Sequence, residues 1–175
     1  MIDAYPSLRT NLESIAYASY LCELVEQLTE VHDPNQEIFR LLDFSFRYLS
    51  AIPGERIARL FEIKLLNEIG WLPHVDSCLG CEKAEIEEGF FSARQGALYC
   101  KNCYQNITDA RPISREVLSI LRYDIHHDLE TSLKLGMSKQ DEDGLAHLMD
   151  RFFQDRLQRP LKTRQFLSKI KHVLV

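Results

Sequence analysis

The sequence predicts a mainly α-helical bundle with an inserted four-cysteine, zinc-ribbon-like β-hairpin. Apolar residues recur at helical spacing on both sides of residues 78–103. Two Cys-x-x-Cys pairs bracket that segment, and a Gln-Gly turn lies inside it between two short β-type runs. The 175 residues suit one domain with a sizeable core. We therefore expect a single domain over residues 1–175, with a zinc-binding insertion at about residues 74–106.

Three helices are expected before the cysteines. The first, from residue 7 to about residue 31, has an apolar stripe in which Cys22 should be a small buried hydrophobe. Asp33 should cap the second helix, with Pro34 at its first position. The third runs from about residue 55 to residue 69, and it should end at Gly70, before Pro73. The stripe of the first helix consists of Leu8, Leu12, Ile15, Cys22, Val25 and Leu28.

Three more helices are expected after the cysteines. Ser114 can cap the first of them, which should end at the His126-His127 pair. A linker is expected around residues 135–138, followed by a helix from residue 141 to about residue 157 with acidic residues in its first turn. The last helix should begin at about Thr163.

The four cysteines Cys78, Cys81, Cys100 and Cys103 are the clearest chemical signal in the chain. Each Cys-x-x-Cys pair can form a tight turn that directs two thiolates to one centre, and two pairs complete a tetrahedral zinc site. The intervening hairpin, residues 90–94 and 97–99 around Gln95-Gly96, would return the second pair to the first. Because four cysteines close the coordination shell, we expect a structural rather than a catalytic zinc ion.

Other uses of these thiols fit less well. The sequence lacks the features of a signal peptide, and no apolar run approaches the ~20 residues that cross a bilayer. We therefore expect a cytoplasmic, reducing environment without a membrane partner, where structural disulfides are rare. A thioredoxin-like redox motif would place a single pair at the start of a helix in a βαβ unit, which this pattern does not match.

Catalysis has little support in the sequence. There is no phosphate-binding loop, no Gly-x-Ser-x-Gly and no His-Glu-x-x-His motif. Asp141-Glu142-Asp143 lacks the rest of a calcium-binding loop. We expect no enzyme, although groups distant in the sequence could still meet in the fold.

Charge is unevenly distributed along the chain. Residues 151–175 contain seven Lys or Arg and one acid, whereas the whole chain has a net charge of −5. A solvated helix face and a surface for phosphates or acidic peptides are both compatible with this pattern. The candidate DNA- or partner-binding residues are Arg151, Arg156, Arg159, Lys162, Arg164 and Lys169.

Four short motifs follow one another along the chain. The N-terminal motif is LRTNL, at residues 8–12, and NQEIFRLL follows at residues 35–42. GWLP leads into the first cysteine pair, and RPLKTRQFL lies at residues 159–167. In this order the motifs resemble the RecO family of bacterial recombination-repair proteins, in whose closing motif serine is usual at the position of Thr163. RecO proteins begin with an OB-fold domain, whereas this chain starts in the helical region, so the resemblance covers the helical, zinc-bearing part.

The resemblance implies a non-catalytic mediator of recombinational repair. Such a protein binds single- and double-stranded DNA, promotes strand annealing, and works with RecR to load RecA onto DNA coated by SSB. It would be cytoplasmic and associated with the nucleoid. The family contacts the acidic, phenylalanine-ended tail of SSB, so we expect Arg156, Arg159, Lys162 and Arg164 to contact partners. The alternative is a zinc-ribbon adaptor that binds other proteins and does not bind DNA.

Overall fold

The computed structural model describes residues 5, 8, 11–30, 32–157 and 159–173, without the side chains of residues 171–173. The chain divides into two compact units. Residues 1–70 and 157–175 form the four-helix unit, and residues 71–156 form the cysteine-bearing unit. No helix in the described part of the chain is both long and apolar enough to cross a membrane.

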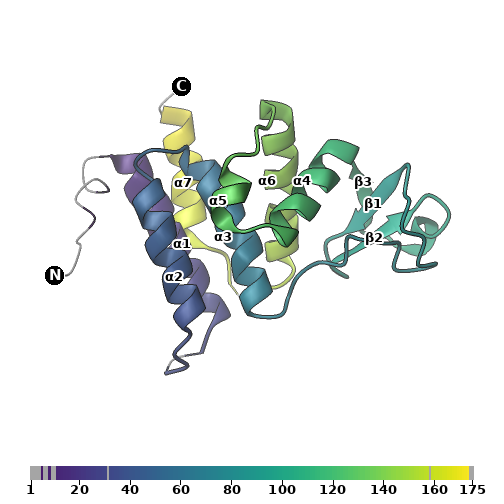
Figure 1. The fold of residues 1–175 in the computed structure, drawn as a ribbon, viewed down its shortest axis with the longest axis horizontal. Coiled ribbons are helices and arrows are strands. Elements are labelled where there is room, and N and C mark those ends of the chain that lie inside the picture. The colour runs from purple at the N-terminus through teal and green to yellow at the C-terminus, as the bar shows by residue number, and fades with distance from the viewer. Residues whose placement is uncertain (1–4, 6–7, 9–10, 31, 158, 174–175) are drawn as a thin grey trace. The chain divides into compact units, whose positions relative to one another are not determined.

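The four-helix unit is built around α1. It contains α1 (Leu12–Leu28), α2 (Gln36–Tyr48), α3 (Gly54–Glu68) and α7 (Lys162–Val173), and α1 contacts each of the other three (Figure 1). The helix α7 thus comes from the far end of the sequence to complete the unit. The largest fully buried side chains here are Tyr20, Leu21, Leu24, Ile57, Leu60, Phe61, Ile63, Leu65 and Leu66.

The ends of these helices follow their capping residues. The second helix begins two residues later than expected, because Asn35 rather than Asp33 is its N-cap and accepts hydrogen bonds from two backbone N–H groups. Gly70 follows α3 with a φ of +72°, which confirms its predicted role in ending that helix. Residues 7 and 31, the expected limits of the first helix, lie outside the described residues.

The predicted apolar stripe of the first helix is wrong at three of its positions. Leu8 is buried, and Val25 and Leu28 are half-buried, but the other members are exposed. Leu12 and Ile15 are 56% and 41% exposed, and Cys22 is also exposed. The buried face of α1 consists instead of Ser14, Ala16, Tyr17, Tyr20, Leu21 and Leu24. The stripe was misplaced because tyrosines and small residues, which are weaker apolar signals than leucine, face the neighbouring helices.

The cysteine-bearing unit combines a small sheet with three helices. Strands β1 (Gly89–Ser92), β2 (Ala97–Cys100) and β3 (Arg111–Ile113) form an antiparallel sheet in the order β2-β1-β3 (Figure 1). The short 3-10 helix η2 (Tyr104–Asn106) lies between β2 and β3 in the sequence. The remaining helices are α4 (Arg115–His126), α5 (Leu129–Leu133) and α6 (Lys139–Gln154). The buried residues of this unit include Leu98 on β2 and Leu121, Leu145, Met149, Phe152 and Phe153 on its helices.

The predicted fold class is confirmed: the chain is mainly helical, with a small antiparallel sheet and a four-cysteine cluster. Ser114 caps α4 as predicted and accepts a hydrogen bond from the Val117 N–H. The sequence did not predict β3 or α5, which are among the shortest elements. The arrangement as a single domain with an insertion at about residues 74–106 stays a prediction.

Candidate metal centre and cationic surfaces

The second cysteine pair is delivered by the hairpin of β1 and β2. The strands pair Gly89 with Cys100 and Ser92 with Ala97, so Cys100 lies at the end of the hairpin away from its turn. Gly96 in that turn has a φ of +63°, a conformation that glycine adopts without strain. Cys103 follows in a tight turn, in which its N–H donates to the Cys100 carbonyl at 3.0 Å.

The first cysteine pair is held against β2 by backbone hydrogen bonds. The Leu98 N–H donates to the His74 carbonyl, and the Leu79 N–H donates to the Leu98 carbonyl, each at 2.9 Å. Gly80 lies between the two cysteines of the pair, where a Cβ would come within 3.1 Å of the Cys103 Sγ. The segment thus approaches the second pair so closely that a larger residue at this position would require a small shift of the Cys103 side chain.

The four cysteine side chains converge on one point. Their Sγ atoms all lie within 4.8 Å of one another, and the Cys81 and Cys100 sulfurs are 3.8 Å apart. Cys78 is buried, Cys100 and Cys103 are half-buried, and Cys81 is exposed. This is the cluster that the spacing of the two pairs predicts.

Backbone N–H groups favour the thiolate form of Cys78. Burial alone raises the pKa of its thiol, but N–H groups of Cys100, Gly80 and Cys81 point to the sulfur and lower that pKa to about 6. The Cys100 N–H donates to this sulfur at 3.3 Å. Hydrogen bonds with the sulfurs of Cys100 and Cys81 raise the pKa of Cys103 to about 12. Of the four cysteines, Cys78 therefore has a sulfur that favours the thiolate, which is the form that binds metals.

The cluster fits a zinc ion in both donor type and spacing. Zinc sites of four thiolates have Zn–S bonds of about 2.3 Å, which places neighbouring sulfurs roughly 3.8 Å apart in a tetrahedron. The separation of the Cys81 and Cys100 sulfurs matches that value. N–H groups directed at the sulfurs supply the outer-shell hydrogen bonds that such sites use.

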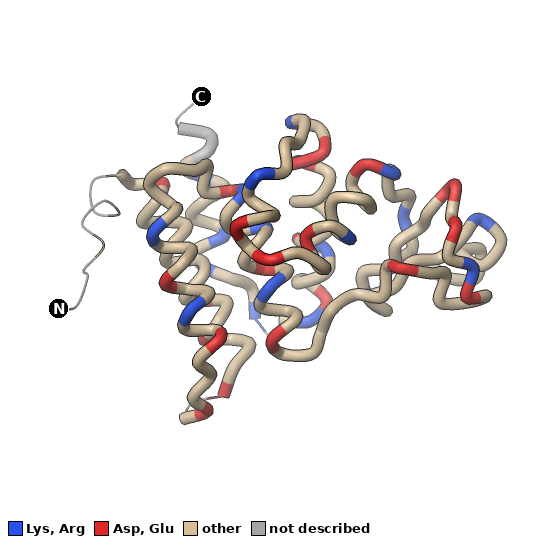
Figure 2. Tube along the Cα trace, viewed as in Figure 1, with Lys and Arg blue, Asp and Glu red and all other residues tan. Residues whose placement is uncertain are grey.

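The candidate cationic residues are divided between the two units. Charged residues of both signs occur in both units (Figure 2). Arg151 and Arg156 belong to the cysteine-bearing unit and are half-buried, whereas Lys162 and Lys169 are exposed on α7 in the four-helix unit. Arg164, also on α7, is half-buried near Tyr20 and Glu62. The six cations of the sequence prediction thus belong to two units, and their role in binding DNA or a partner stays a prediction.

A groove on the four-helix unit lies beside two of these cations. Its volume is about 720 Å³, and its apolar lining includes Ile15, Cys22 and Phe46. Arg159 and Lys162 line the same groove, together with Glu23 and Glu26. The nearest atoms of the Arg159 and Glu26 side chains are 3.9 Å apart, and both side chains are largely exposed. Ile15 and Cys22 of the predicted stripe thus belong to an accessible groove that contains two cations and two carboxylates.

Glu23 on α1 caps the start of α7. Its carboxylate accepts hydrogen bonds from the N–H groups of Lys162 and Thr163, each at 2.9 Å, and from the Thr163 hydroxyl. Burial opposes ionisation and would raise the pKa of Glu23, but these three hydrogen bonds together outweigh it and lower that pKa below its ordinary value. A carboxylate distant in the sequence therefore fixes the helix that carries Lys162 and Lys169.

Replacing Glu23 with glutamine should destabilise the chain by about 1 kcal/mol at neutral pH, the usual value of a lost N-cap. Because the folded pKa of Glu23 is lowered, its contribution is present above the unfolded pKa, about 4.3. That contribution is lost as the pH falls through the folded pKa. Urea denaturation at a series of pH values checks this: the difference between wild type and Glu23→Gln should shrink on acidification.

Glu26→Gln is the matched control, because Glu26 is on the same helix, is largely exposed and faces only a distant Arg159. Its effect should be close to zero across the same pH range. Equal losses in the two variants would contradict the capping role of Glu23.

Several residues of this region could not be found from the sequence. Glu23 caps a helix about 140 residues away, and no local motif marks it. In the cysteine-bearing unit, Arg111 and Arg151 donate to carbonyl groups of the same turn, residues 108–110, although they are far apart in the sequence. The helix α4 ends at His126, with His127 as its C-cap, which confirms the C-terminus predicted at this pair. Asp141 and Glu142 form the predicted acidic first turn, here at the start of α6.

The fold is mainly helical, and one of its two units has a β-hairpin with a cluster of four cysteines. The family model described as "Recombination protein O C terminal" matches residues 9–165. The chain belongs to this family.

Three relatives named "DNA repair protein RecO" illustrate the match. The protein of Pelotomaculum thermopropionicum is 30% identical over 168 residues, which cover 96% of this chain and 66% of the relative. That of Caldicellulosiruptor saccharolyticus is 30% identical over 172 residues, with 98% and 70% covered. That of Halalkalibacterium halodurans is 26% identical over 171 residues, with 97% and 67% covered. The chain thus spans about two thirds of the length of these relatives.

Proposed function

We propose that this chain is the helical, zinc-bearing part of a non-catalytic mediator of recombinational DNA repair. In this role it binds single- and double-stranded DNA, SSB and RecR, and it promotes strand annealing and the loading of RecA. Membership of the family and the names of the relatives support the repair role. Action on chromosomal DNA also implies a cytoplasmic protein at the nucleoid.

We infer that Cys78, Cys81, Cys100 and Cys103 hold one zinc ion with a structural task. The apolar core beside the cluster is small: Cys78, Ala97 and Tyr99 are its buried members, and Phe90 and Tyr104 stack at its edge with ring centroids 3.6 Å apart. Metal binding of on the order of 10 kcal/mol orders such a segment when its own core is small. With four thiolates bound, zinc supplies folding energy and keeps no position for a substrate.

The groove on the four-helix unit is the proposed site for the SSB tail. An acidic peptide that ends in phenylalanine needs an apolar pocket for the ring and cations for its carboxylates. Ile15, Cys22 and Phe46 supply the apolar wall, and Arg159 and Lys162 supply the cations. This combination in one groove is the observation that carries the assignment. Arg156 and Arg164 stay predictions as partner contacts, because both are half-buried against other groups.

Titration of the chain with a fluorescent SSB tail peptide tests this site. Arg159→Gln/Lys162→Gln should weaken binding by about tenfold, since a contact at the centre of an interface is commonly worth more than about 1 kcal/mol. Peptide should also slow alkylation of Cys22, which lies in the groove. Arg40→Gln is the control, because Arg40 is exposed on α2 and pairs with Glu37.

A wild-type chain that fails to bind the peptide at high micromolar concentration would refute partner binding by this unit. Equal affinity in the groove variant and the Arg40 control would refute the groove alone. The Lys162 N–H that Glu23 caps is unchanged in Lys162→Gln, so α7 should retain its position.

An adaptor without DNA binding is the second candidate function. Between the cysteine pairs, Glu82, Glu85, Glu87 and Glu88 are all exposed. Such a surface repels phosphates and favours a basic protein partner. Fluorescence anisotropy with a single-stranded oligonucleotide at two salt concentrations separates the two functions. Binding that falls steeply with salt supports the mediator, and no binding at low salt supports the adaptor.

A further inference from the structure

Two arginines of the cysteine-bearing unit converge on one backbone turn. Arg111 Nη1 donates to the Thr108 carbonyl at 3.1 Å and to the Ala110 carbonyl at 2.9 Å. Arg151 Nη2 donates to the Asp109 carbonyl at 2.7 Å. These hydrogen bonds orient both guanidinium groups without neutralising them, because carbonyl groups carry no net charge.

Positive charge exceeds negative charge around this turn. The Asp109 carboxylate accepts hydrogen bonds from the Ser92 hydroxyl and the Arg94 N–H, and those bonds lower its pKa despite its partial burial. Arg94 also interacts electrostatically with Asp109. The turn thus carries one carboxylate, that of Asp109, and binds two guanidinium groups, those of Arg111 and Arg151, so the charge at this place is net positive.

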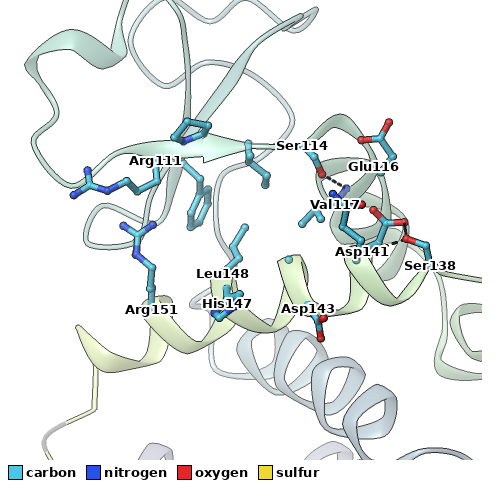
Figure 3. A pocket seen from close by; sticks show the side chains of 16 residues that line it. Arg111, Ser114, Glu116, Val117, Ser138, Asp141, Asp143, His147, Leu148 and Arg151 are labelled. Carbon is cyan, nitrogen blue, oxygen red and sulfur yellow. Dashed lines mark hydrogen bonds between the residues drawn. The ribbon is translucent and has the colours of Figure 1, made fainter.

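The Arg111 and Arg151 side chains lie at one end of a pocket between β3 and α6 (Figure 3). The pocket has a volume of about 710 Å³, within the range of small-molecule sites. Pro112, Val117 and Leu148 give it apolar walls. This combination of cations and apolar surface is that of a site for an anion with a flat, uncharged part.

The opposite end of the pocket decides between ligand classes. Glu116 and Asp141 lie there, away from the two arginines (Figure 3). A peptide with several acidic residues would be repelled at that end. A nucleotide carries its negative charge on the phosphate alone, and its base is neutral, so it matches both ends of the pocket.

We propose that this pocket binds an unpaired nucleotide of single-stranded DNA, with the backbone phosphate on Arg111 and Arg151 and the base against Pro112, Val117 and Leu148. The proposal rests on the DNA-binding part of the proposed function and gives it a location. A base inside a duplex is stacked and paired, so only a single strand can place one in the pocket. Planar guanidinium groups match phosphate oxygens with paired hydrogen bonds.

Anisotropy with a fluorescent strand of about 12 nucleotides, within the usual site sizes of single-strand binders, tests the proposal on the full chain. The Arg111→Gln/Arg151→Gln variant should bind about tenfold more weakly. The slope of log affinity against log salt should fall by about 0.7, the value for one phosphate contact on a single strand. The control variant Arg40→Gln/Arg115→Gln removes the same amount of charge outside the pocket. It should change the affinity and the salt slope less than Arg111→Gln/Arg151→Gln does.

A second variant avoids any loss of the carbonyl hydrogen bonds. Pro112→Glu places a negative charge on the exposed wall of the pocket and leaves both arginines in place. It should weaken binding to the single strand as strongly as the double arginine variant does. In the wild type, a strand with abasic residues should bind more weakly than the intact strand, because the base occupies the pocket.

The outcomes distinguish this site from the proposed function. If the wild type binds no DNA at low salt, the DNA-binding function fails, and this site fails with it. If the wild type binds but the Arg111/Arg151 and Pro112 variants match the control, DNA binding stands and the pocket is refuted. Equal weakening by the control variant would also refute it, since the effect would then reflect net charge alone.

Discussion

Replacing Cys78 with serine should release the metal from the cysteine cluster and unfold the hairpin around it. Cys78 is the most buried of the four cysteines, and its sulfur accepts the Cys100 N–H. A lost thiolate removes much of a binding free energy on the order of 10 kcal/mol, which the small core around Ala97 and Tyr99 cannot replace. Hydrogen–deuterium exchange should show lost protection across residues 74–106 in Cys78→Ser.

Cys22→Ser is the matched control, because Cys22 is exposed in the other unit, outside the cluster. It should retain the metal and the protection of the hairpin. A chelator added to the wild type should reproduce the exchange pattern of Cys78→Ser. Unchanged protection in Cys78→Ser would mean that the hairpin folds without the metal.

The second large effect concerns a buried ion pair in the four-helix unit. Arg59 Nη2 and Glu62 Oε1 are 2.7 Å apart, and the Tyr20 hydroxyl donates to the same carboxylate oxygen. Burial raises the pKa of Glu62, although Arg59 opposes that shift. Arg59→Met should therefore lower the free energy of unfolding by about 3–5 kcal/mol, the cost of leaving one partner of a buried pair uncompensated.

The Arg40 and Glu37 pair on α2 provides a close comparison. Its N···O distance is also 2.7 Å and its spacing is three residues, but its side chains are 62% and 55% exposed, against 9% and 0% for Arg59 and Glu62. Arg40→Met should cost less than about 1 kcal/mol. Urea denaturation measures both variants, and equal small losses would contradict a structural role for the buried pair.

The sequence predicted best where local chemistry determines the structure. The two cysteine pairs and the Gln95-Gly96 sequence predict the hairpin and the cluster. The turn itself is longer than predicted, because Ser92 pairs with Ala97 and residues 93–96 connect the strands. Gly70 and Ser114 mark helix ends through a left-handed φ and a side-chain cap.

The parts that the sequence did not predict depend on tertiary contacts. Tyr17 and Tyr20 lie on the buried face of α1 because α3 offers Glu62 as a hydrogen-bond acceptor for Tyr20. The third strand has only three residues and forms because β1 pairs with it. Arg111 and Arg151 meet at the turn of residues 108–110, which no pattern in the sequence relates to both.

The most direct test of the account is the metal content and coordination of the purified chain. Elemental analysis with X-ray absorption at the zinc edge should give one zinc ion per chain, surrounded by four sulfur atoms at about 2.3 Å. A chain without bound metal, or with its four clustered thiols oxidised to disulfides, would contradict it.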